Sequence, residues 1–259
     1  MLGRRIAVAI IGIPILIGLL YAGNLIFASA VGLIILLSLV EFYRLVAEID
    51  IKANLPLGLF FAAFLPVIVL YYGTAAMIAW LTAAVFLALF WKIFFPQASI
   101  AGVGITLLGI FYVGLLSHLV LIDKLPQGKL LVIFTFVATW IADTAAYAVG
   151  RLAGRRPLAA RISPKKTLEG LVGAIIINLV LFAFLKWVPG FSLGGRLLFA
   201  FAVTITATLG DLTESAFKRE AGVKDSGNLI PGHGGFLDRF DSMIFTAAAA
   251  YYLIRILGG

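Results

Sequence analysis

The residues with the clearest capacity for chemistry are gathered in one polar run, from Asp211 to Asp241. This run holds half of the chain's twelve acidic side chains, four Lys and Arg residues, and one of the two histidines, His233, which glycines flank on both sides. Carboxylates suit a divalent metal, Lys and Arg suit phosphate, and glycines let a backbone approach a ligand closely. The combination predicts phosphoryl chemistry that uses a metal ion.

Helical spacing orders the acidic residues of this run. Asp211, Glu214 and Lys218 follow the i, i+3, i+7 pattern of one helix face. Asp238 and Asp241 are also one turn apart, at the expected start of a second helix. A favourable interaction with the helix dipole, worth under about 1 kcal/mol, would explain one or two of these acids on structural grounds alone. It does not explain why acids, bases and glycines gather together.

A second polar segment has the sequence SPKKTLEG and begins at Ser163. Its adjacent lysines, Lys165 and Lys166, are flanked by hydroxyls and can donate several hydrogen bonds to a polyphosphate. Thr167 is expected to cap the helix that follows, whose N-terminus attracts anions. The alternative is that these basic residues only signal membrane topology. The G-x-x-x-x-G-K-[ST] phosphate-binding loop does not occur in this segment.

Other polar residues stand alone in apolar sequence. Asp143 is one of them, and a charge there costs several kcal/mol unless it is paired, so we favour a functional role over a structural one. Glu41 and Arg44 are expected to form an ordinary ion pair one helical turn apart. His118 has no acidic neighbour in the sequence and is expected to be structural.

The composition indicates a polytopic membrane protein of the all-α class. Hydrophobic residues make up 63% of the chain, charged residues 12%, and the mean hydropathy is +1.12. Soluble domains carry about 25% charged residues. The excess of Lys and Arg is therefore interpreted as a topology signal, and no nucleic-acid partner is expected. The chain has no cysteine, which excludes disulfides and thiolate chemistry.

A membrane-spanning helix needs about 20 mostly apolar residues, and the hydropathy pattern predicts about nine of them. Residues 1–122 are expected to serve packing or dimerisation, and residues 123–259 to form the catalytic region, with two long loops at 150–167 and 216–238. The predicted spans are 6–22, 25–47, 55–72, 74–91, 100–122, 129–149, 168–188, 195–215 and 239–257.

The basic residues divide unequally between the two sides of this arrangement. Fifteen of the twenty Lys and Arg residues fall on the side that holds the N-terminus and both long loops. The positive-inside rule makes this side cytoplasmic. The candidate site is therefore expected to open to the cytoplasm.

The C-terminal polar run also resembles a known signature, that of the phosphatidate cytidylyltransferases (CDP-diacylglycerol synthases). The segment SPKKTLEG and the surroundings of Asp143 resemble the same family, whereas residues 1–122 match it only in hydropathy. The signature positions are Ser215, Phe217, Lys218, Arg219, Lys224, Asp225, Gly227, Ile230, Pro231, His233, Gly234, Gly235, Phe236, Asp238, Arg239, Phe240 and Asp241.

This resemblance implies that the protein transfers the cytidylyl group of CTP to phosphatidate and releases pyrophosphate. It implies Mg²⁺, with K⁺ as a further cation, and places the metal on Asp211 and Asp238, with Asp241 as a third ligand. It also implies a homodimer in the plasma (inner) membrane of a prokaryote.

The expected roles of individual residues follow from this reaction. Besides the two metal-binding aspartates, Lys218, Arg219 and His233 are expected to act at the reacting phosphates. The lipid phosphate is already anionic near neutral pH, so no strong general base is expected. The residues expected to bind substrate are Asp143, Ser163, Lys165, Lys166, Thr167, Lys224 and Arg239.

Three other classes of function remain open at this point. A CTP-dependent lipid kinase would need the same metal and lysines, and would release CDP instead of pyrophosphate. A transporter would place its charges near the middle of the bilayer, whereas most charges here lie in the predicted loops. A structural scaffold gives no reason for the glycine-flanked histidine and the clustered acids.

Overall fold

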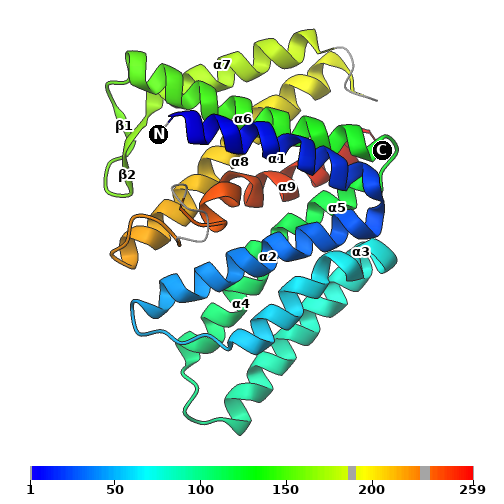
Figure 1. The fold of residues 1–259 in the computed structure, drawn as a ribbon, viewed down its shortest axis with the longest axis vertical. Coiled ribbons are helices and arrows are strands. Elements are labelled where there is room, and N and C mark those ends of the chain that lie inside the picture. Colours follow the sequence, from blue (N-terminus) through cyan, green and yellow to red (C-terminus); the bar gives the residue numbers. More distant parts are fainter. Residues whose placement is uncertain (1, 186–190, 228–233, 259) are drawn as a thin grey trace.

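A computed structural model describes residues 2–185, 191–227 and 234–258. Figure 1 shows that the fold is almost wholly helical, which confirms the predicted all-α membrane protein. The helices are α1 (Leu2–Ala22), α2 (Asn24–Ala47), α3 (Leu55–Phe94), α4 (Ile100–Gly114), the short 3-10 helix η1 (Leu115–Ser117), α5 (His118–Asp123), α6 (Gly128–Ala153), α7 (Leu168–Phe184), α8 (Leu193–Glu220) and α9 (Leu237–Leu257).

Within the described ranges, six helical segments are long and apolar enough to cross a membrane, so the prediction of nine is wrong. Predicted spans 55–72 and 74–91 correspond to the two halves of α3, which counts once among these six segments. Predicted span 168–188 gives a helix of 17 residues, α7, below the roughly 20 residues that a crossing needs. In α1, the stretch Gly12–Ala22 is apolar but too short to be counted as a membrane-spanning helix.

Helix α3 reverses its direction at Gly73. This residue has φ 73° and ψ −160°, a conformation that glycine adopts without steric cost. The indole nitrogen of Trp80 donates a hydrogen bond of 2.8 Å to the carbonyl of Phe61, and the two rings lie 4.8 Å apart. In a straight helix these residues would be separated by about 28 Å. The two halves of α3 therefore run back along each other, as Figure 1 shows.

A small β-hairpin occupies most of the first predicted loop. Strand β1 (Pro157–Ala159) pairs antiparallel with β2 (Ser163–Thr167), which contains the two adjacent lysines. Thr167 then caps α7, because its hydroxyl accepts a 3.1 Å hydrogen bond from the backbone of Gly170. This confirms the predicted cap. The hairpin itself was not predicted, since its sequence carries no strand alternation.

Glu169, in the first turn of α7, binds the segment that leads into the hairpin. The carboxylate of Glu169 accepts hydrogen bonds of 3.0 and 3.1 Å from the backbone nitrogens of Arg155 and Arg156. These two donors, first Arg155 and then Arg156, hold the pKa of this exposed carboxyl below its usual value. The contact fixes the direction in which the chain leaves α6.

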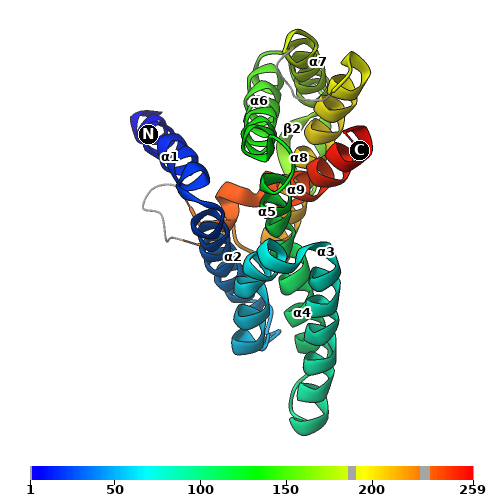
Figure 2. The same cartoon turned by 90° about the vertical axis from the view of Figure 1, so that its right-hand side faces the viewer.

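Helices α2, α5 and α9 meet in the centre of the molecule. They contact one another, and Phe42, Ile122 and Ile244 are fully buried there. Figure 2 shows α6, α7 and α8 grouped toward one end of the molecule and α3 with α4 extending to the other, while α1 lies to one side. This packing brings the last turns of α2 next to the beginning of α9.

Candidate active site

Three carboxylates from two helices gather where α8 and α9 cross. Asp211 and Glu214 lie one turn apart on α8, and Asp241 faces them from α9. One oxygen from each side chain lies within 4.8 Å of the others. We call these three residues the acidic cluster. Its two members on α8, Asp211 and Glu214, have the helical spacing predicted from the sequence, and the third member comes from the next helix.

Gly210 allows the two helices to come this close. A β-carbon built at this position would lie 2.5 Å from the backbone oxygen of Asp241 and 3.2 Å from the α-carbon of Ser242. Side-chain carbon atoms do not approach backbone oxygens so closely in folded proteins. The absence of a side chain at position 210 therefore sets the distance between Asp211 and Asp241.

Asp238 lies in the first turn of α9 and is paired with a lysine. Its Oδ1 accepts a 2.6 Å hydrogen bond from Lys218 Nζ, and the same ammonium group also bonds Glu214 of the acidic cluster. Its Oδ2 accepts bonds from the backbone of Gly235 at 2.8 Å and from the backbone and hydroxyl of Ser226 at 3.0 and 2.9 Å. Asp238 therefore links the loop after α8 to the acidic cluster through Lys218.

The β-hairpin contributes a second lysine to the site. Lys166 Nζ lies 2.5 Å from Asp211 Oδ2. Arg219 holds the hairpin in place, because its Nε donates a 3.2 Å bond to the carbonyl of Ile162 while its Nη1 donates a 3.0 Å bond to the carbonyl of Val223. The two polar segments singled out in the sequence thus meet at one site.

Asp143 approaches the same site from α6. Its Oδ1 accepts a 3.3 Å bond from the hydroxyl of Ser242, the residue that follows Asp241. Thr139 is buried on the same helix, with its hydroxyl bonded to a backbone carbonyl, and Tyr147 is largely exposed. Of the three residues that share this face of α6, Asp143 is the one that reaches the beginning of α9.

The remaining predicted residues differ in their exposure to solvent. Ser163 is half-buried in β2, and Lys165 beside it is exposed. Lys224 and Arg239 are exposed on the loop after α8 and on the first turn of α9. His233 lies outside the described residues. The cations in direct contact with the acidic cluster are Lys166 and Lys218, among the described residues.

Glu41 was missed by the sequence interpretation, and the expected ion pair with Arg44 is wrong. Its side chain is 1% exposed and its Oε2 accepts a 2.8 Å bond from the backbone nitrogen of Leu237, while Arg44 is exposed. The hydroxyl of Ser226 lies 3.3 Å from the same oxygen. Because these partners are 185 and 196 residues away in sequence, no local spacing could have indicated them.

His118 lies in the core, as expected for a structural residue. Its Nδ1 is 2.8 Å from the carbonyl of Leu115, and its ring packs against those of Tyr251 and Tyr252, with centroid distances of 5.6 and 5.5 Å. These aromatic contacts join the start of α5 to α9.

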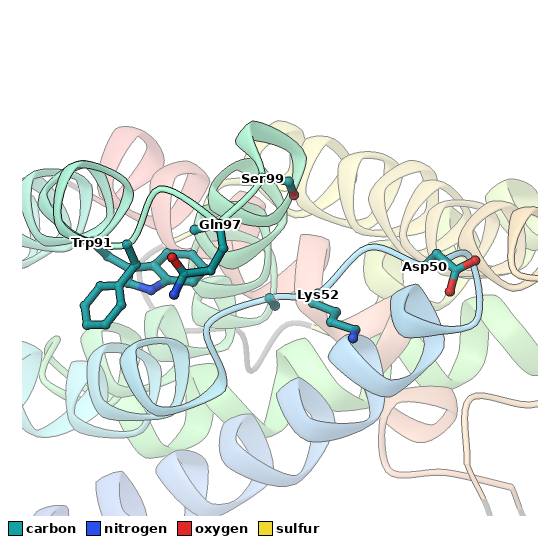
Figure 3. Close-up of a pocket in the computed structure, with 8 residues that line it drawn as sticks. Asp50, Lys52, Trp91, Gln97 and Ser99 are labelled. Atoms are coloured by element: carbon teal, nitrogen blue, oxygen red, sulfur yellow. The ribbon is translucent and has the colours of Figure 1, made fainter.

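A pocket of about 440 Å³ lies between the connection from α2 to α3 and the connection from α3 to α4. Figure 3 shows Asp50, Lys52, Trp91, Gln97 and Ser99 around it. Its lining includes no residue of the acidic cluster. This pocket is therefore separate from the site described above.

Comparison with known proteins identifies one family. The model of the cytidylyltransferase family matches residues 3–257. A phosphatidate cytidylyltransferase of Synechocystis sp. is 37% identical over an alignment of 289 positions. The alignment covers 98% of this chain and 97% of that protein. The chloroplastic phosphatidate cytidylyltransferase 5 of Arabidopsis thaliana is 34% identical over 93% of this chain and 69% of its own length. A phosphatidate cytidylyltransferase of Bacillus subtilis is 41% identical over 158 residues, 60% of this chain and 59% of that protein.

Proposed function

The chain belongs to the cytidylyltransferase family, and we propose that it transfers the cytidylyl group of CTP to phosphatidate, giving CDP-diacylglycerol and pyrophosphate. The observation that carries this proposal is the acidic cluster with two lysines, placed at the ends of apolar helices. One substrate is a soluble polyanion and the other a lipid with its phosphate at the membrane surface. A site built from helix ends serves both.

The acidic cluster suits Mg²⁺. Its donors are carboxylate oxygens, the hard ligands that this ion prefers. The oxygens of Asp211, Glu214 and Asp241 lie within 4.8 Å of one another, so the three side chains are close enough to hold one ion together. When bound, the ion would supply charge neutralisation at the phosphates and favour departure of pyrophosphate. We propose these three residues as its ligands, with Asp238 linked to them through Lys218.

The lysines of the site have two roles. Lys166 extends from β2 toward Asp211, and Lys165, the residue before it, is exposed. An ammonium group there stabilises negative charge that develops on the triphosphate. Lys218 is engaged by Glu214 and Asp238, and its role is to hold these two carboxylates in fixed positions.

The bond changes balance without a strong base. An anionic oxygen of the lipid phosphate forms a bond to the α-phosphorus of CTP, and the bond from that phosphorus to the bridging oxygen of the β-phosphate breaks. The electron pair leaves with pyrophosphate. Because the nucleophile carries no proton in its reactive form, alignment and charge stabilisation by the site residues supply most of the acceleration.

We further propose that the site faces the cytoplasm. Figure 1 shows the hairpin, the beginning of α9 and the connection from α2 to α3 on the same side of the molecule. These segments carry Lys52, Arg161, Lys165, Lys166 and Arg239. An excess of basic residues on one side supports a cytoplasmic orientation.

The test is to give detergent-purified protein CTP, phosphatidate and Mg²⁺ and to identify both products. We expect CDP-diacylglycerol with pyrophosphate, and a large loss of rate in Asp211→Asn and Asp241→Asn. Asp50→Asn is the matched control, because this acid lines the separate pocket and asparagine tolerates its positive φ of 60°. CDP with a newly phosphorylated lipid would instead identify a lipid kinase, and folded protein without CTP turnover would refute both activities.

A further inference from the structure

We propose that Glu41 of α2 is a positioning residue of this active site, which fixes the beginning of α9 and so keeps Asp238 bonded to Lys218 and Asp241 in the acidic cluster. This inference rests on the proposed function. It assigns a role in catalysis to a helix whose sequence carries no sign of one.

Glu41 supplies the missing cap of α9. The first backbone nitrogens of a helix have no partner within the helix and need one from elsewhere. Phe236, at the N-cap position, makes no side-chain capping bond. The carboxylate of Glu41 accepts the 2.8 Å bond from Leu237, the first residue of α9, and a negative charge at a helix N-terminus is stabilising. A residue from α2 therefore fixes the start of the helix that carries Asp238 and Asp241.

The glycines of the loop close around this carboxylate. A β-carbon at Gly227 would lie 2.7 Å from Glu41 Oε1, and one at Gly235 would meet Oε2 still more closely. No side chain fits at either position while Glu41 keeps its place. These two glycines are thus explained by the approach of the backbone to Glu41.

A continuous set of contacts joins Glu41 to the acidic cluster. The hydroxyl of Ser226 lies 3.3 Å from Glu41 Oε2 and 2.9 Å from Asp238 Oδ2. A hydroxyl has one proton to donate, so the shorter contact to Asp238 is its main bond, and the backbone of Leu237 is the main partner of Glu41. Asp238 in turn holds Lys218, which bonds Glu214. Displacing Glu41 would therefore move the beginning of α9, which carries Asp241, and disturb the contacts of Asp238 with Ser226 and Lys218.

The test compares steady-state kinetics of Glu41→Ala, Glu41→Asp and Glu41→Gln. Glutamine keeps an acceptor oxygen at the correct reach, whereas alanine removes it and aspartate shortens it by one carbon. A displacement of about 1 Å at a reaction centre costs roughly 100-fold in rate. We expect a loss of kcat of that order in Glu41→Ala, a smaller loss in Glu41→Gln, and a higher Mg²⁺ concentration for half-maximal rate in Glu41→Ala and Glu41→Asp.

Glu48→Gln is the matched control, because Glu48 is exposed at the same end of α2 and should leave all these values unchanged. If Glu41→Ala does not fold, the same kinetic measurements are made on Glu41→Gln and Ser226→Ala. A folded Glu41→Ala with parental kcat and Mg²⁺ dependence overturns the inference. Lower thermal stability with unchanged kinetics of the folded fraction also overturns it, because that result means a purely structural role. A parent protein that makes no CDP-diacylglycerol refutes the proposed function instead.

Discussion

The close crossing of α8 and α9 gives the most direct test of the site geometry. Alanine at position 210 would place its β-carbon 2.5 Å from the backbone oxygen of Asp241, whereas an ordinary contact begins at 3.4 Å. The helices must therefore separate by about 0.9 Å along this contact, because both atoms belong to rigid helical backbone. The carboxylates of Asp211 and Asp241 would move apart with them.

The expected effect on stability is small and the expected effect on activity is large. Overpacking lowers the free energy of unfolding by about 1–3 kcal/mol. Replacing glycine by alanine inside a helix raises it by about 1 kcal/mol. The net loss of stability is then at most about 2 kcal/mol. A displacement near 1 Å at the reaction centre lowers the rate by about 100-fold. We expect Gly210→Ala to fold, to melt a few degrees lower, and to lose most of its cytidylyl transfer.

The assay measures pyrophosphate release and CDP-diacylglycerol formation beside thermal unfolding in the same detergent. Gly104→Ala is the control, since a β-carbon added to this helical glycine of α4 would have no atom within 4 Å, and the position should tolerate alanine. Parental activity in Gly210→Ala, with an unchanged Mg²⁺ requirement, would refute the argument that this glycine sets the spacing of the acidic cluster.

Three further outcomes are expected. Lys166→Ala removes the cation that faces Asp211, so the KM for CTP should rise with little change in melting temperature; an unchanged KM contradicts a phosphate-binding role. Arg219→Lys cannot keep both backbone contacts of the guanidinium, so the KM for CTP should also rise, and hydrogen exchange in the hairpin should quicken. Trp80→Phe removes the bond to Phe61 and should lower stability by about 1 kcal/mol without altering the kinetics of the folded enzyme; a loss of activity would mean that the reversal in α3 influences the site.

The parts of the site that the sequence predicted are those with a local pattern. Asp211, Glu214 and Lys218 follow helical spacing, and α8 presents them together. The adjacent lysines indicated a polyanion, and Lys166 does reach the acidic cluster. Thr167 was expected to cap a helix and does so. Each of these inferences needed only a few consecutive residues.

The parts that escaped prediction depend on distant contacts. Glu41 has the same local surroundings as an ordinary surface glutamate, and only the packing of α2 against α9 buries it. The pairing of Asp238 with Lys218 joins residues from two helices across a loop. Such contacts depend on how the helices pack in three dimensions, which the hydropathy pattern does not predict.

The balance of charge at the site explains why its lysines and acids belong together. Asp211, Glu214 and Asp241 bring three carboxylates into a small volume beside apolar helices, and such a group is costly unless cations compensate it. Lys166 contacts one member and Lys218 another. Since Lys218 also serves Asp238, the carboxylates outnumber the ammonium groups that touch them. A divalent cation would restore the balance and leave Lys166 available for the incoming triphosphate, so binding of metal and of nucleotide should favour each other. In equilibrium binding measurements, the affinity for CTP should therefore rise with the Mg²⁺ concentration in the parent protein. In Asp211→Asn it should depend much less on the Mg²⁺ concentration.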